Sequence, residues 1–160
     1  MTHTVSLIGC GRISFKHIEA FIENSDIMKM SSACDPVITR AEEKAKEYQT
    51  NVSCAAVKVY RDYRKMLEDS KPDIVTVAAE SGKHKTIAID CLNAGCHVIC
   101  EKPMALSTQD ADEMIEAAQR NNRKLAVCFQ NRFNGPIQKL RSALEAGRFG
   151  KILHGMAQIR

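Results

Sequence analysis

No apolar run in the sequence approaches the roughly 20 residues that a membrane-spanning helix needs. The first residues, Met1 to Thr4, lead directly into an apolar segment and lack the layout of a signal peptide. A strong charge imbalance is also missing: 23 lysines and arginines against 19 aspartates and glutamates leave a net charge of +4, without any basic run. This excess is too small to indicate nucleic-acid binding. We therefore expect a soluble, cytoplasmic protein that binds neither nucleic acids nor membranes.

The composition is typical of a globular domain. Apolar residues make up 44% of the 160 residues and charged residues 26%, which excludes a disordered or collagen-like chain. The length suits one domain with its own core. Seven cysteines are present, an odd number, and Cys34, Cys100 and Cys128 lie inside apolar segments. We expect them to be buried free thiols in a reducing compartment.

A metal site is the alternative use of the cysteines. Cys91, Cys96, His97 and Cys100 are close in sequence. Their spacing matches no zinc signature, and the pattern distributes them over a helix, a turn and a strand. We therefore expect no metal site.

Short β-branched runs alternate with longer amphipathic stretches along the chain. This pattern predicts strands and helices in turn, with a Thr39–Glu42 capping box opening the second helix. Strands are expected at residues 4–9, 28–35, 74–79, 97–100 and 124–129, and helices at residues 13–24, 39–48, 62–67, 85–93, 107–121 and 136–146, with a short segment at 52–56. Because such alternation requires right-handed crossovers, we predict a doubly wound α/β fold with a parallel sheet.

The last ten residues form a different pattern. Residues 151–160 alternate between two sets of side chains, as a new strand would. We interpret residues 1–150 as one domain and 151–160 as the start of a truncated second domain. An unpaired strand of this kind is also a candidate for edge-to-edge association.

A glycine turn follows the first predicted strand. Gly9 and Gly11 stand where a strand would pass into a helix. In a dinucleotide site, the first glycine makes the tight turn and the second lets the backbone approach the pyrophosphate, which the helix N-terminus then binds. Ser14 occupies the third position, where a small residue is needed. The alternative is an ordinary strand-to-helix turn.

Asp35 ends the second predicted strand. An acid there accepts hydrogen bonds from the adenosine ribose and repels a 2′-phosphate, so it favours NAD over NADP. Two alternatives stay open: Asp35 only caps the turn through Pro36, or Arg40 offsets the repulsion and admits NADP.

Glu101, Lys102 and Pro103 follow the strand predicted at residues 97–100. The carboxyl ends of parallel strands face the ligand crevice, so Glu101 and Lys102 are candidates for an ion pair or for contact with a nicotinamide ribose. A lysine beside a positive cofactor ring suits proton transfer or polarisation of a substrate oxygen. By itself, the motif is also compatible with a simple charged turn.

Together these motifs resemble the glucose–fructose oxidoreductase / inositol dehydrogenase / rhizopine-catabolism (Gfo/Idh/MocA) family, over essentially the whole chain. Residues 94–103 are very specific to it. The resemblance implies an N-terminal Rossmann domain with strand order 3-2-1-4-5-6 and a second α+β domain that this chain lacks. Residues 80–84 and 130–134 resemble members that oxidise nucleotide-sugar uronates such as UDP-N-acetylglucosaminuronate.

The resemblance also implies roles for individual residues. Lys102 is expected to assist catalysis, with Glu101 positioning it, and both lie at the nicotinamide end. The cofactor-binding residues it implies are Gly9, Gly11, Arg12, Ile13, Asp35, Ala79, Glu80, Ser81, His84, Glu101, Lys102, Asn131 and Arg132. Ser14 in place of glycine or alanine, and a loop without proline at 80–82, depart from the family pattern.

The family implies an NAD(P)-dependent dehydrogenase that moves a hydride between a sugar, nucleotide-sugar or cyclitol hydroxyl carbon and the cofactor. We expect a homo-oligomeric parent protein, and we expect this chain alone to bind cofactor without turnover. One alternative is a stand-alone cofactor-binding or redox-sensing module, and another is a Rossmann domain that binds nothing.

Three residues have simpler interpretations. We expect His17 to be a surface or packing histidine. The alternative to a cofactor contact for His84 is a hydrogen bond to a backbone group. Cys10 lies between the glycines. Either the amides at the start of the helix lower its pKa and make it redox-sensitive, or the thiol is inert.

Overall fold

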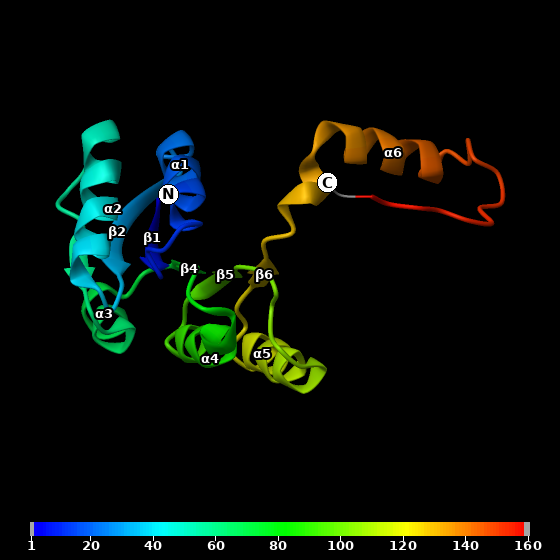
Figure 1. The fold of residues 1–160 in the computed structure, drawn as a ribbon. Helices are drawn as coiled ribbons and strands as arrows, with labels where there is room; N and C mark the ends of the chain where they lie inside the picture. The colour runs from blue at the N-terminus through cyan, green and yellow to red at the C-terminus, as the bar shows by residue number, and fades with distance from the viewer. Residues whose placement is uncertain (1, 159–160) are drawn as a thin grey trace. The chain divides into compact units, whose positions relative to one another are not determined.

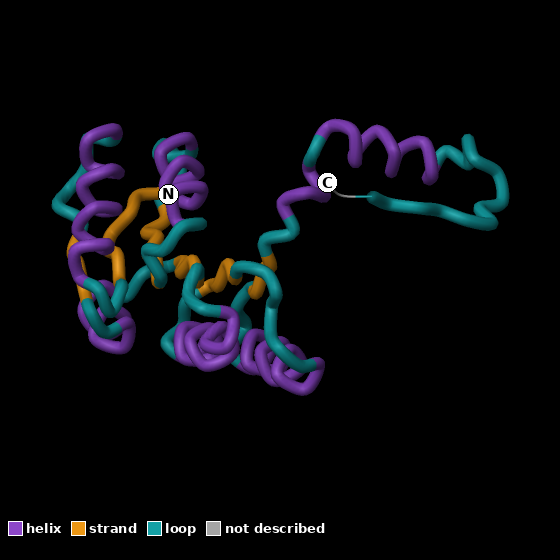
Figure 2. The backbone as a smooth tube through the Cα atoms, in the orientation of Figure 1, coloured by secondary structure: helices purple, strands orange, loops and turns teal. Residues whose placement is uncertain are grey.

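The computed structural model describes residues 2–158, which form two compact units (Figures 1 and 2). The first unit extends to Cys128 and the second begins at Phe129. The division therefore falls before residue 150, and the prediction that a second domain begins at residue 151 stays a prediction. Among residues 2–158, no helix has both the length and the apolar character needed to cross a membrane.

The first unit is built on a six-stranded sheet in the order β3-β2-β1-β4-β5-β6, and all neighbouring strands are parallel. The strands are β1 (His3–Ile8), β2 (Met28–Cys34), β3 (Lys58–Tyr60), β4 (Ile74–Val77), β5 (His97–Cys100) and β6 (Leu125–Val127). The doubly wound α/β fold and its strand order are thus confirmed. The third strand lies just after the segment noted at residues 52–56.

Five α-helices of this unit cover the two faces of the sheet. They are α1 (Ser14–Glu23), α2 (Ile38–Asn51), α3 (Tyr63–Ser70), α4 (His84–Asn93) and α5 (Thr108–Arg120), with a 3₁₀ turn, η1 (Ser81–Lys83), before α4. Leu7 packs in a core with α1 and α2, whereas the next residue, Ile8, packs in a core with α3, α4 and α5. Because successive strand residues point to opposite faces, the two cores lie on opposite sides of the sheet. Figure 1 shows α4 and α5 side by side against β4–β6.

Side-chain caps begin two of the helices, at the first residues of the ranges expected at 62–67 and 107–121. Asp62 accepts a hydrogen bond from the Arg64 amide at the start of α3, and Ser107 accepts one from the Asp110 amide at the start of α5. The capping box predicted at Thr39 is wrong. Helix α2 begins one residue earlier, with Val37 as its N-cap and no side-chain cap, so Thr39 lies inside the first turn.

The second unit holds a 3₁₀ turn, η2 (Gln130–Phe133), and one α-helix, α6 (Gly135–Glu145). Pro136 lies in the first turn of α6, where its missing N–H costs nothing. The strand predicted at residues 151–160 is absent from residues 151–158, and residues 159–160 lie outside the described chain. A strand needs a neighbouring strand to satisfy its backbone groups, and none pairs with this segment among the described residues.

Candidate functional site

A cleft of about 960 Å³ opens at the carboxyl ends of β1, β2 and β4. Its walls include the glycine turn, the end of β2, the start of α3 and the loop that leads from β4 into α4. Small-molecule sites have volumes of about 300–1,000 Å³, and open α/β sheets bind ligands at this edge, where the strand order reverses. The reversal here lies between β1 and β4. The cleft is therefore the candidate binding site.

The two glycines of the turn have different structural roles. Gly9 has φ +91°, and a Cβ there would lie 2.5 Å from the backbone C and O of Ala78. Gly11 has open space on its side-chain side, with nothing within 4 Å. Gly9 is thus required by the fold, whereas the bare Cα of Gly11 leaves room for a ligand. Ser14 is fully buried and donates from Oγ to the Gly11 carbonyl at 2.6 Å, which explains how a serine fits the third position.

Asp35 is buried at the end of β2 and contacts the glycine turn. Its Oδ2 accepts the Cys10 amide at 2.9 Å, and its Oδ1 accepts the Val37 amide at 2.8 Å. The bond from the Val37 amide is the turn cap considered above as an alternative role for Asp35. The bond from the Cys10 amide is not indicated by the sequence pattern. Each oxygen keeps a further lone pair, so the carboxylate is still able to accept hydrogen bonds from a diol.

Cys10 is not an activated thiol. It is 4% exposed, and burial, reinforced by the charge of Asp35, raises its pKa to about 12. The alternative in which helix-start amides lower the pKa of Cys10 is wrong, because its desolvation dominates.

Three arginines line the cleft beside Asp35: Arg40, Arg61 and Arg64. Arg61 donates to the Pro36 carbonyl at 3.3 Å, and Arg64 pairs with Asp90 at 3.0 Å. The sequence pattern points only to Arg40. It indicates no strand at residues 58–60, so it does not place Arg61 at the carboxyl end of a strand.

Glu101 follows β5 and contacts helix α1. Its Oε1 lies 3.0 Å from Nε2 of His17, and its Oε2 accepts the backbone N–H of Lys102 at 3.1 Å. The ion pair considered between Glu101 and the Lys102 side chain is absent among residues 2–158, and Lys102 is exposed at the edge of the sheet. His17 was expected to be a surface or packing residue, and its partner lies 84 positions away in sequence.

His84 begins α4 and is 1% exposed. Nδ1 lies 2.8 Å from the Pro103 carbonyl oxygen and Nε2 lies 3.0 Å from that of Ala79. This is the backbone-binding role that the sequence left as an alternative. His84 therefore joins the loop after β4 to the loop after β5, and its predicted contact with a cofactor stays a prediction.

Other predicted site residues are distributed over both units. Arg12 and Ile13 are exposed at the start of α1, and Glu80 is exposed before η1, in which Ser81 is half-buried. Among these, Glu80 lines the cleft, as Ala79 also does. Asn131 and Arg132 lie on η2 in the second unit, and their place in the site stays a prediction.

One group of potential metal ligands occurs among residues 2–158. His17, Glu101 and Cys128 present ligand atoms that all lie within 4.8 Å of one another. Burial lowers the pKa of His17 more than the neighbouring Glu101 raises it, and burial raises the pKa of Cys128 to about 11. Nε2 of His17 and Oε1 of Glu101 already lie at hydrogen-bond distance, 3.0 Å, with the Cys128 thiol beside them. The cysteines considered first, Cys91, Cys96 and Cys100, are buried in the core instead.

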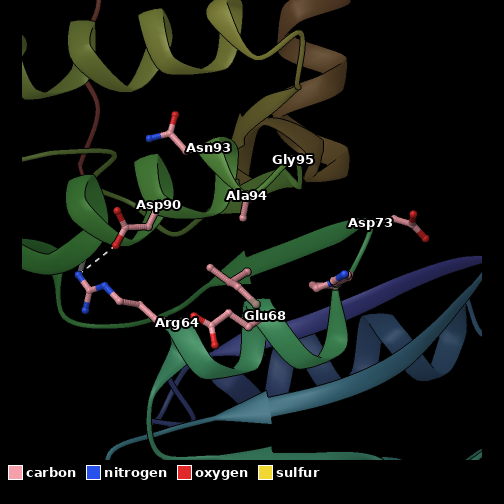
Figure 3. Close-up of a pocket in the computed structure, with 10 residues that line it drawn as sticks. Arg64, Glu68, Asp73, Asp90, Asn93, Ala94 and Gly95 are labelled. Carbon is pink, nitrogen blue, oxygen red and sulfur yellow. Dashed lines mark ion pairs between the residues drawn. The ribbon is translucent and has the colours of Figure 1, made fainter.

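A second hollow, of about 540 Å³, lies between α3 and α4 (Figure 3). It extends to the segments that precede β4 and β5, where Asp73 and Gly95 lie, and the Arg64–Asp90 ion pair spans it. This is the opposite end of the strands from the glycine turn. Because ligands of open α/β sheets bind at the carboxyl ends, the site belongs to the first cleft.

Residues 3–129 match a protein family, Gfo/Idh/MocA, described as an oxidoreductase family with an NAD-binding Rossmann fold. Among curated proteins, the D-glucoside 3-dehydrogenase of Escherichia coli K12 is 34% identical over 149 residues, covering 92% of this chain and 40% of that protein. The inositol 2-dehydrogenase of Salmonella typhimurium LT2 is 27% identical over 158 residues, covering 97% and 46%. The chain thus spans less than half the length of these relatives.

Two solved structures are similar in both fold and sequence. The WlbA dehydrogenase from Chromobacterium violaceum, in complex with NADH and UDP-GlcNAcA, has a TM-score of 0.86 and 32% identity, covering 93% of this chain and 41% of that one. The WlbA dehydrogenase from Bordetella pertussis, with the same two ligands, has a TM-score of 0.82 and 32% identity, covering 94% and 44%. The resemblance found in the motifs is confirmed by these matches.

Proposed function

Because this chain belongs to the Gfo/Idh/MocA family of oxidoreductases with an NAD-binding Rossmann fold, we propose that its cleft binds a nicotinamide dinucleotide, with NAD preferred over NADP. The whole protein would transfer a hydride between the cofactor and the hydroxyl carbon of a sugar, nucleotide sugar or cyclitol. The chain described here supplies the cofactor-binding half of that reaction.

The glycine turn is the observation that carries this proposal. Gly11 has an open side-chain position beside the cleft, and the turn is held by Asp35. A pyrophosphate would bind the free N–H groups at the start of α1 with Gly11, Arg12 and Ile13 around it. The hydroxyls of the adenosine ribose would donate to Asp35, whose negative charge disfavours a 2′-phosphate.

The nicotinamide half would extend toward the loop after β5. Ala79, Glu80 and Ser81 of the loop after β4, together with Glu101 of the loop after β5, would surround it. His84 would hold the loop after β4 in place through its contact with the Ala79 carbonyl. The bound cofactor supplies the hydride acceptor or donor. Lys102, exposed at the carboxyl edge, would take or return the proton of the substrate hydroxyl or orient its oxygen. Asn131 and Arg132 would approach the nicotinamide or the substrate.

The substrate class rests on the relatives. Two solved relatives contain UDP-GlcNAcA and curated relatives are named for glucosides and inositol. We therefore favour a sugar-type substrate, with a nucleotide-sugar uronate as the most specific candidate. A cytoplasmic location and a homo-oligomeric parent protein are part of the same proposal.

A second candidate is a cofactor-binding module that senses the redox state without catalysing turnover. It needs only the cleft and the glycine turn, both of which lie within residues 2–158. The two candidates differ in how the chain responds to the oxidation state of the cofactor. A sensor would adopt different structures with NAD⁺ and with NADH. Half of an enzyme would not need such a difference, but it would require further residues for turnover.

The proposal is tested by calorimetric titration of the chain with NADH, NADPH and ADP. We expect NADH to bind in a 1:1 complex and more tightly than NADPH, with ADP competing for the same cleft. Absence of binding by all three ligands would contradict the proposal and favour a Rossmann domain that binds nothing. Equal affinity for NADH and NADPH would contradict the assigned role of Asp35.

A further inference from the structure

Helix α1 contacts the loop after β5 through His17, outside the residues that line the cleft. The imidazole Nε2 lies 3.0 Å from Oε1 of Glu101, and the two side chains are only 11% and 13% exposed. The helix begins at Ser14, directly after the glycine turn. One helix therefore presents its N-terminus at the phosphate end and, one turn later, reaches the loop after β5.

The contact fixes the carboxylate of Glu101 in one orientation. Oε1 is bound by His17 and Oε2 by the Lys102 amide, and the Cys128 thiol lies within 4.8 Å of both side chains. Burial favours the neutral form of His17, because the lowering of its pKa by desolvation exceeds the opposite effect of Glu101. A carboxylate is only an acceptor, so the neutral imidazole donates its Nε2–H to Glu101.

The role of His17 is not explained by apolar packing. The core on this face of the sheet includes Ile18 and Phe21 of the same helix, whereas the imidazole of His17, also buried, lies against the carboxylate of Glu101. A buried imidazole on this helix has a cost that an apolar side chain would avoid. Its hydrogen bond to Glu101 offsets that cost and places an anchored acceptor at the edge of the sheet.

We propose that His17 is a positioning residue for the nicotinamide half of the dinucleotide: it holds Glu101 so that the carboxylate accepts hydrogen bonds from the nicotinamide ribose. This inference rests on the proposed function, because it assumes that the cleft binds a nicotinamide dinucleotide. The adenosine half is bound elsewhere, beside Asp35, so His17 acts on one half of the ligand only.

The test compares NADH with ADP, which lacks the nicotinamide nucleoside. His17→Met removes the N–H donor but keeps a side chain of similar volume. We expect NADH affinity to fall about tenfold, the loss that corresponds to one hydrogen bond to a charged group. ADP affinity should be unchanged. In His17→Gln, the amide nitrogen replaces Nε2 and should keep NADH affinity within about threefold of the original. The shorter His17→Asn should behave like His17→Met.

Two further variants separate positioning from general damage. Glu101→Gln should weaken NADH as His17→Met does, and the double variant should be no weaker than Glu101→Gln alone, since both changes remove one interaction. His97→Met is the matched control. His97 accepts the Lys124 amide at 2.9 Å at the start of β5, so its loss removes a histidine hydrogen bond at the opposite edge of the sheet and should leave both ligands unaffected.

The outcomes distinguish this inference from the proposed function. If the unaltered chain binds ADP and NADH but His17→Met binds NADH equally well, the positioning role is overturned while the function stands. Equal weakening of ADP and NADH in His17→Met would also overturn it, because the helix rather than Glu101 would then be responsible. If the unaltered chain binds neither ligand, both the function and the inference fail. Should His17→Met not fold, His17→Gln and His17→Asn decide the question by the same comparison.

Discussion

The backbone N–H of Cys10 donates a hydrogen bond to Oδ2 of Asp35 at 2.9 Å. The acid that ends β2 therefore holds the glycine turn at the end of β1, 25 residues earlier in sequence. A second bond, from the Val37 amide to Oδ1, fixes the same carboxylate on its other side. The residue proposed to select the cofactor is thus also part of the structure that places the turn.

Replacement of Asp35 should change both specificity and stability. In Asp35→Ala, the 2′-phosphate of NADPH is no longer repelled, so the preference for NADH should disappear. The amides of Cys10 and Val37 lose their acceptor, which should lower the free energy of unfolding by about 1–3 kcal/mol. Ligand titration and urea unfolding measure the two effects.

Asp62→Ala is the matched control for Asp35→Ala. Asp62 also lines the cleft and caps α3, so its loss should cost about 1 kcal/mol of stability. It should leave the ratio of NADH to NADPH affinity unchanged. A change of that ratio in Asp62→Ala, or an unchanged ratio in Asp35→Ala, would contradict the role assigned to Asp35.

The two glycines of the turn should respond differently to alanine. Gly9→Ala places a Cβ 2.5 Å from backbone atoms of Ala78 at φ +91°, so we expect a loss of stability of at least about 2 kcal/mol. Gly11→Ala meets no atom within 4 Å. It should therefore fold normally but weaken NADH binding, because the methyl group occupies the space for the pyrophosphate.

Thermal unfolding and NADH titration of both variants check this contrast. Gly147→Ala serves as a reference for strain alone, since Gly147 has φ +66° and no atom near its side-chain position. The prediction is wrong if Gly11→Ala unfolds as readily as Gly9→Ala, or if it binds NADH as tightly as the unaltered protein.

Asp73 should make part of the stability depend on pH. Its Oδ2 accepts the amide of Thr4 at 2.7 Å and the hydroxyl at 2.9 Å, which lowers its pKa below the ordinary 3.8. A carboxyl with a depressed folded-state pKa stabilises the fold above about pH 3.8, and that contribution is lost as the pH falls through the lower folded value. Since the side chain is about half exposed, we expect roughly 1 kcal/mol.

Urea unfolding of the unaltered protein and Asp73→Asn measures this contribution. The variant should be less stable at pH 7, and the difference should shrink as the pH is lowered toward 3. Asp26→Asn, which alters an exposed acid before β2, should show neither effect. A difference that stays constant between pH 7 and pH 3 would exclude the carboxylate as its cause.

Thiol labelling should follow burial rather than proximity to the glycine turn. Burial raises the pKa of Cys10, Cys34 and Cys100 to about 12, so almost no thiolate is present at pH 8. Cys54 and Cys128 are both partly exposed, but burial raises the pKa of Cys128 to about 11, so Cys54 should react first with iodoacetamide. Mass mapping after brief labelling identifies the site, and Cys54→Ser should abolish the fast phase.

Denaturation provides the control for labelling, since all seven cysteines should then react at similar rates. Rapid modification of Cys10 in the folded protein would contradict the inert role assigned to it here.

Local patterns in the sequence predict most elements of the fold and part of the cleft. Apolar periodicity, glycine after a strand and acids at strand ends are local signals, and they correctly indicate a parallel sheet, the turn at Gly9 and the position of Asp35. Local signals failed where the element was short or the cap ambiguous. The three-residue β3 has too few positions for a periodic pattern, and Thr39 matched a capping box although α2 begins at Ile38.

Which of these residues make contact depends on how the elements pack in three dimensions. His17 and Glu101 are 84 positions apart, and Cys10 and Asp35 are 25 apart. Whether such pairs make contact depends on strand register and on the face of the sheet that each helix covers, neither of which a local pattern contains. The same reason applies to His84, whose two partners become neighbours only because β4 and β5 pair.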